Sequence, residues 1–75
     1  MYNTQDMANR IKIEIKKNGK SIKDMLNSLD MGINTISDFS KGQQLSCISL
    51  AKIADYLGCS VDYLMGRTDN PKINQ

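Results

Sequence analysis

Apolar residues recur every three or four positions along most of the chain, which is the spacing of one face of an amphipathic helix. Polar stretches containing Gly, Asn or Ser separate these segments, and such residues commonly cap or end helices. The pattern predicts an all-α fold with five helices in one compact domain. With their capping residues included, the expected helices span residues 6–17, 21–29, 32–42, 46–58 and 60–66.

The first segment carries two competing patterns. Residues 11–16 alternate between apolar and charged side chains, as a half-buried strand does. A helical wheel nevertheless gathers four apolar residues within about 100°: Met7, Ala8, Ile11 and Ile15. We predict a helix, because it accounts for a longer segment and no second strand is available for pairing. Ile13 then points away from the core, either as a stray exposed residue or as part of a contact with another chain.

The second and third segments form a helix, a short turn and another helix. Ser21 followed by Asp24 resembles a capping box, and the apolar stripe behind it comprises Ile22, Met25, Leu26 and Leu29. Two residues then lead to Gly32, which we expect to be the pivot of the turn and the N-cap of the next helix. Gly42 is expected to end that helix in a left-handed conformation. This order matches the helix-turn-helix unit.

The third helix has two different faces. Ile36 and Phe39, three residues apart, share the inner one. The opposite face collects short polar groups: Asn34, Ser37, Asp38 and Lys41. Such a face suits either a surface that reads DNA or an ordinary solvated helix, and the helix and turn before it favour DNA.

Two shorter helices complete the domain. Ser46 is expected to cap the first, whose apolar stripe is Cys47, Leu50, Ile53, Ala54 and Leu57. Ser60 is expected to cap the second, whose inward residues are Val61, Leu64 and Met65. We expect a domain over residues 1–66, with a loose arm at 1–5, and a frayed polar tail at 67–75.

The composition of the 75 residues argues against several classes of protein. No apolar run could span a membrane and the start is not a signal peptide, so we expect a cytoplasmic protein. Cys47 and Cys59 form no CxxC pair and the chain has no histidine, so we expect two reduced, mostly buried thiols and no metal. Without a histidine, a Gly-rich phosphate loop or a nucleophile beside a recognisable base, we expect no enzyme, cofactor or small-molecule ligand.

Charge is distributed unevenly along the chain. The formal net charge is +2, but residues 10–25 hold six basic and two acidic residues, so this window carries +4 and the remainder −2. A basic segment suits phosphate contact. A helix with lysines for solubility would have the same composition.

A family resemblance emerges from these pieces. Residues 21–42 resemble the helix-turn-helix of the Cro/repressor (XRE-type) DNA-binding family, and residues 46–66 resemble the two helices that close that domain. The resemblance spans residues 6–66, and its most specific parts are Thr35-Ile36-Ser37, Lys41-Gly42 and the run from Leu57 to Gly66.

The resemblance implies a fold like the phage repressor DNA-binding domain and a transcriptional regulator of double-stranded DNA. The second helix of the motif would enter the major groove of a two-fold operator. It further implies a homodimer through the C-terminal helix and tail, around Tyr63, Met65 and Arg67. The expected role is repression, in a phage, a mobile element or an antitoxin module.

Site residues follow from the same resemblance. The base-reading candidates are Ile33, Asn34, Ser37 and Asp38. Asn pairs with adenine and Asp accepts from cytosine, whereas Ile33 is equally compatible with a place in the core. The phosphate-contacting candidates are Arg10, Lys20, Ser21, Lys23, Lys41, Gln43 and Gln44.

Two departures from the family pattern keep an alternative open. Many members carry Gln directly after the cap of the second helix, where this chain has Ile22, and the reading helix here is poor in Arg, Lys and Gln. The composition of the reading helix and an exposed Ile13 would support a protein-interaction module of the same fold, with weakened DNA binding.

Overall fold

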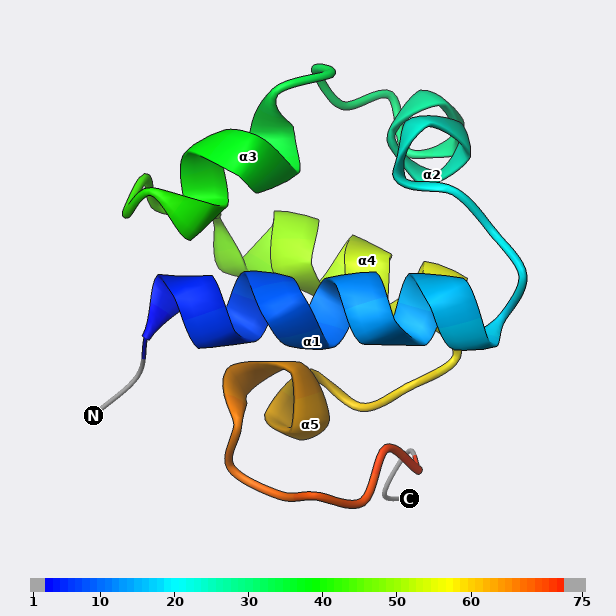
Figure 1. Cartoon of the computed structure of the whole chain (residues 1–75), viewed down its shortest axis with the longest axis vertical. Helices are drawn as coiled ribbons and strands as arrows, with labels where there is room; N and C mark the ends of the chain where they lie inside the picture. Colours follow the sequence, from blue (N-terminus) through cyan, green and yellow to red (C-terminus); the bar gives the residue numbers. More distant parts are fainter. Residues whose placement is uncertain (1–2, 73–75) are drawn as a thin grey trace.

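The computed structural model describes residues 3–72 and contains five helices and no strand within that range (Figure 1). They are α1 (Thr4–Lys17), α2 (Ile22–Ser28), α3 (Thr35–Ser40), α4 (Cys47–Leu57) and α5 (Val61–Met65). The all-α, five-helix prediction is confirmed, including the choice of helix over strand for the first segment.

Helix α1 is the centre of the fold. It packs against α3, α4 and α5, with α2 and α3 on one side of it and α5 on the other (Figure 1). All five helices supply core residues, and the largest fully buried side chains are Ile11, Met25, Leu26, Ile36, Ile53 and Leu64. The predicted stripes therefore converge on one core, while Ile13 is 52% exposed, as its place on the wheel requires.

Serine caps fix the starts of three helices. The hydroxyls of Ser21, Ser46 and Ser60 accept from the backbone N–H three residues on, at 3.0–3.1 Å. Each such cap contributes about 1 kcal/mol. The three predicted caps are confirmed.

Both ends of the chain are more ordered than the sequence suggested. Helix α1 begins at Thr4, because the side chain of Asn3 accepts from two backbone N–H groups of its first turn. The expected loose arm is thus wrong for residues 3–5, and residues 1–2 lie outside the described range. The tail is held rather than frayed over residues 67–72, since Ser60 N donates to Pro71 O at 2.9 Å; residues 73–75 lie outside the description.

The two cysteines differ, although both were expected to be mostly buried. Cys47, the first residue of α4, is exposed, whereas Cys59 is buried. Burial, reinforced by the nearby Glu14 carboxylate, raises the pKa of the Cys59 thiol to about 11. Glu14 itself is only 5% exposed, and its closest cationic partner is Lys17 Nζ at 3.6 Å.

Within residues 3–72, no helix is long and apolar enough to cross a membrane, and no cluster of three potential metal ligands occurs.

Candidate nucleic-acid interface

The connection between α2 and α3 is longer than predicted and turns at a different residue. Helix α2 ends at Ser28 and α3 begins at Thr35. Met31 N donates to Leu26 O at 2.8 Å and Asp30 N to Asn27 O at 3.2 Å, which is the hydrogen-bond pair of a Schellman motif. The left-handed residue of this motif is Asp30, with φ 57°. Gly32 is therefore not the pivot, and its predicted role as N-cap of α3 is wrong as well.

Gly32 contributes its carbonyl to the start of α3. Thr35 N donates to Gly32 O at 3.1 Å and Thr35 Oγ1 donates to the same oxygen at 2.6 Å. The N-cap residue is Asn34, whose side chain makes no capping hydrogen bond. Its carboxamide, exposed to solvent, is consequently free to meet a ligand.

The four base-reading candidates are all exposed. Ile33 is 73% exposed, so the alternative that placed it in the core is wrong. Asn34, Ser37 and Asp38 are exposed as well, while Ile36 and Phe39 are buried. The start of α3 and the two residues before it thus expose an apolar side chain, an amide, a hydroxyl and a carboxylate.

Asp38 lies in the first turn of α3, where the helix dipole favours an acid. Across residues 3–72, neither an ion pair nor a hydrogen bond engages its carboxylate. Lys41, on the next turn, therefore does not neutralise it. A carboxylate presented this way offers only acceptor atoms to a partner.

The end of α3 folds back into the following loop. Gln43 N donates to Asp38 O at 3.0 Å and Gly42 adopts φ 108°, so the predicted left-handed end at Gly42 is confirmed. The loop presents three exposed phosphate candidates: Lys41, Gln43 and Gln44.

The start of α2 presents three other exposed candidates: Lys20, Ser21 and Lys23. The Ser21 hydroxyl is already engaged as the helix cap. Lys20 Nζ lies 4.3 Å from the centroid of the Tyr56 ring, a cation–π contact that holds it beside α4. Lys23 makes no ion pair within the described residues.

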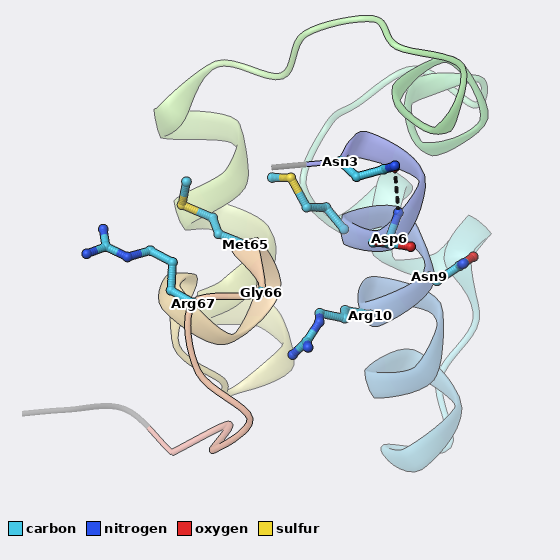
Figure 2. A pocket seen from close by; sticks show the side chains of 8 residues that line it. Asn3, Asp6, Asn9, Arg10, Met65, Gly66 and Arg67 are labelled. Carbon is cyan, nitrogen blue, oxygen red and sulfur yellow. Dashed lines mark hydrogen bonds between the residues drawn. The ribbon is translucent and has the colours of Figure 1, made fainter. Parts of the chain in front are cut away.

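Arg10 is separated from the other candidates by its contacts with α5 and the tail (Figure 2). Its Nη1 donates to the carbonyls of Tyr63 and Thr68 at 3.1 and 3.2 Å, and its Nη2 pairs with Asp69 at 3.3 Å. The guanidinium also lies 4.9 Å from the Tyr63 ring centroid. These contacts hold α5 and the tail against α1, so we leave Arg10 out of the proposed interface.

The helix-turn-helix, its exposed outer side and the two closing helices agree with one known domain. A family model for the Cro/C1-type HTH DNA-binding domain matches residues 10–70. The chain belongs to this family. The comparisons found no match among curated proteins and none among solved structures.

Membership makes the chain a DNA-binding domain and identifies α2 and α3 as its helix-turn-helix. Sequence reasoning missed the structural roles of two residues, Asp30 and Thr35, in this part of the Cro/C1-type domain. The left-handed conformation of Asp30 could have been predicted, because Asp tolerates this region better than most residues. Thr35 had no clear signal, because its hydroxyl bond depends on the conformation of the preceding loop.

Proposed function

We propose that the chain is a sequence-specific transcriptional regulator that binds a two-fold operator as a dimer, with α3 in the major groove. The observation that carries this proposal is the outer side of α3. Asn34, Ser37 and Asp38 are exposed polar residues at the start and on the outside of this helix, and Ile33, two residues before it, is exposed as well. A Cro/C1-type domain uses this position for DNA.

The four residues suit base edges in distinct ways. Asn34 can pair in a bidentate manner with adenine, and Asp38 can accept from the amino group of cytosine. Ile33 offers an apolar surface to a thymine methyl, and Ser37 can donate or accept. Each bidentate pair discriminates against a wrong base by about 1–3 kcal/mol.

Phosphate contacts set the register of the helix in the groove. The proposed contacts lie at both ends of the helix-turn-helix: Lys20, Ser21 and Lys23 at the start of α2, and Lys41, Gln43 and Gln44 after α3. Lys23 and Lys41 supply charge without competing ion pairs among residues 3–72.

The size of the domain supports binding as a dimer. Its extents are 29 × 27 × 20 Å, whereas half-sites for this motif lie about 34 Å apart. One copy therefore covers one half-site. Two copies on a promoter would block polymerase, which is the basis for proposing a repressor, in a phage, mobile-element or antitoxin setting.

A gel-shift titration against DNA flanking the chain's own gene tests the proposal, with a random duplex of equal length as the control. We expect one retarded species on the flanking DNA at protein concentrations well below those that shift the random duplex. Equal affinity for both duplexes at all salt concentrations would contradict sequence-specific regulation.

A protein-interaction module with weakened DNA binding is the second candidate. The observation that favours it is the exposure of Ile13 and Ile33, at 52% and 73%, together with the absence of a cation from α3 itself. In that case Asn34→Ala would leave all DNA binding unchanged, whereas Ile33→Asp would abolish capture of the protein partner.

A further inference from the structure

Helix α1 ends on the pair Asn18-Gly19, close to the end of α4. Asn18 is the C-cap of α1, and its side-chain Nδ2 donates to Glu14 O at 2.7 Å and to Leu57 O at 3.5 Å. Leu57 is the last residue of α4. One amide group therefore serves carbonyls at the ends of two helices, although Asn18 itself is exposed to solvent.

Gly19 completes the same helix end. Its N–H donates to Lys16 O at 3.1 Å, and its φ of 66° lies in the left-handed region that favours glycine. Asparagine and glycine are thus the residue types that suit this helix end. The 75-residue sequence contains no other Asn-Gly pair.

The pair also has a chemical reactivity of its own. Asparagine is thermolabile, and glycine places no side chain in the way of its backbone nitrogen. Gly19 N can attack Cγ of Asn18, so that a C–N bond forms, the bond to Nδ2 breaks, and the amide leaves as ammonia with the proton of Gly19 N. The resulting succinimide ring is opened by water at either carbonyl, which leaves aspartate or isoaspartate and requires no other reagent.

The folded chain keeps the two reacting groups apart. The ψ of Asn18 is 4°, so Gly19 N nearly eclipses the backbone nitrogen of Asn18. Ring closure requires Gly19 N to lie instead on the side of Cβ, which leads to Cγ. In addition, the Gly19 N–H and the Asn18 Nδ2 are each held by a carbonyl oxygen, and these hydrogen bonds must break before the attack.

The product of this reaction would weaken the helix end. An ionised aspartate has acceptor atoms only, so it loses both donations and faces two carbonyl oxygens of like partial charge. The C-termini of α1 and α4 are the negative ends of their dipoles, which disfavour an anion. Glu14, only 5% exposed, adds a carboxylate one turn earlier. Lys16 and Lys17 are exposed, so they offset these repulsions only in part.

We propose that Asn18-Gly19 is a spontaneous deamidation site that the folded domain shields and that reacts when the end of α1 opens. Helix ends open at a lower free-energy cost than the core, and each opening allows ring closure. Refolding does not reverse the reaction, so chains that have opened accumulate a weakened contact between α1 and α4. Ser21 caps α2 shortly afterwards, so the site directly precedes the helix-turn-helix. The inference does not depend on the proposed function.

The first measurement follows deamidation of the full chain by mass spectrometry, in buffer and in urea at the same pH and temperature. Fragmentation identifies the modified residue. We expect Asn18 to react first in urea, and roughly tenfold or more slowly in buffer, because the folded chain must open before it reacts. Asn27, which is exposed in α2 and followed by Ser28, is the internal control. Equal rates for Asn18 in buffer and urea, or a faster reaction of Asn27 in urea, would overturn the proposal.

The second measurement tests the weakening by urea denaturation. Chains deamidated in urea and returned to buffer should unfold at lower urea concentrations than fresh chains. Asn18→Asp should do so without incubation, and more strongly than Asn18→Ala, which removes the hydrogen bonds without adding a charge.

Two controls isolate the effect of position 18. Asn27→Asp makes the same charge change in the last turn of α2 and should lower the midpoint less than Asn18→Asp does. Incubated Asn18→Ala cannot cyclise at this position, so it should keep its own midpoint. An Asn18→Asp variant as stable as Asn18→Ala, or an equal loss of stability in incubated Asn18→Ala, would overturn the proposal.

Discussion

The α4–α5 region and the α2–α3 region use the same helix-ending device with different residues. All five helices end in a pair of hydrogen bonds of the Schellman type. Four have glycine as the left-handed residue, including Gly58 and Gly66 in the α4–α5 region. The end of α2 uses Asp30 instead, so the turn that leads to α3 is the one that carries backbone strain.

Polar side chains in the two regions also differ in how far other residues of the chain engage them. Against the α4–α5 region, the guanidinium of Arg10 from α1 is engaged by three partners, the carbonyls of Tyr63 and Thr68 and the carboxylate of Asp69. On α3 the polar groups of Asn34 and Asp38 have no such partners among residues 3–72. Local rules of stability are commonly relaxed at functional sites, and here they are relaxed at the helix proposed to read DNA.

Removal of the Arg10 side chain should give the largest loss of stability at neutral pH. Arg10→Ala deletes hydrogen bonds from a charged, mostly buried group, so the free energy of unfolding should fall by about 2–3 kcal/mol. Urea denaturation measures this, with Lys12→Ala on the same helix as the control. If Arg10→Ala leaves the free energy of unfolding unchanged but lowers the salt slope of DNA binding, Arg10 contacts phosphate instead.

The buried thiol of Cys59 should make the α4–α5 region sensitive to alkaline pH. Its pKa is about 11 in the folded chain, above the ordinary value of 9.0. Below pH 9 the thiol is protonated in both the folded and the unfolded chain, and the contribution of Cys59 to stability is fully present. Between pH 9 and 11 only the unfolded chain ionises, so the free energy of unfolding falls as pH rises. At about 1.4 kcal/mol per pH unit the loss approaches about 3 kcal/mol.

The comparison that isolates this effect is the wild type against Cys59→Ala, unfolded in urea at pH 8, 9, 10 and 11. The stability difference between them should shrink or reverse with pH. Parallel pH curves for the two proteins would show that Cys59 ionises equally in both states.

Phosphate contacts from the α2–α3 region should affect binding but not stability. Lys23→Ala and Lys41→Ala should each lower the salt slope of DNA binding by roughly one and weaken binding to all sequences alike. The free energy of unfolding should change by no more than about 0.5 kcal/mol. Lys72→Ala in the tail is the matched control, and unchanged slopes for both variants would leave these lysines as solvated charges.

The strained turn should give the smallest effect, with the opposite sign from most substitutions. Asp30→Gly relieves the left-handed strain at φ 57° and should raise the free energy of unfolding by about 0.5 kcal/mol, after the entropy cost of glycine. Gly58→Ala, at the equivalent position after α4, should lower it by about 1 kcal/mol. Equal destabilisation by both changes would mean that Asp30 holds the turn through its side chain.

The sequence predicted the α4–α5 region better than the α2–α3 region, for a physical reason. Ser46, Gly58, Ser60 and Gly66 are local signals, and each acts where it was expected. Gly32 was misinterpreted because its role depends on the conformation of residues 29–34, which packing of Met31 against the core sets. Burial of Glu14 and the commitment of Arg10 to α5 depend on tertiary contacts, which the periodicity of one helix does not contain.

For the proposed site, the sequence predicted the helix that carries the candidates, which the structure shows as α3, but not the exposure or hydrogen bonds of each residue. The place of Ile33 at the edge of the apolar stripe was compatible with either a buried or an exposed side chain, and the structure shows it exposed. The absence of a capping bond from Asn34 was likewise invisible, because Gly32 was expected to hold the N-cap position.

The central claim is that the outer side of α3 reads bases. The most direct measurement is a binding-site selection from random duplexes with the wild type, Asn34→Ala and Asp38→Asn, and with Ile13→Ala as the control. The account predicts a two-fold motif for the wild type and control, loss of an adenine preference with Asn34→Ala, and a shift from cytosine towards adenine at a different position with Asp38→Asn. Identical base preferences at every position for all four proteins would contradict it.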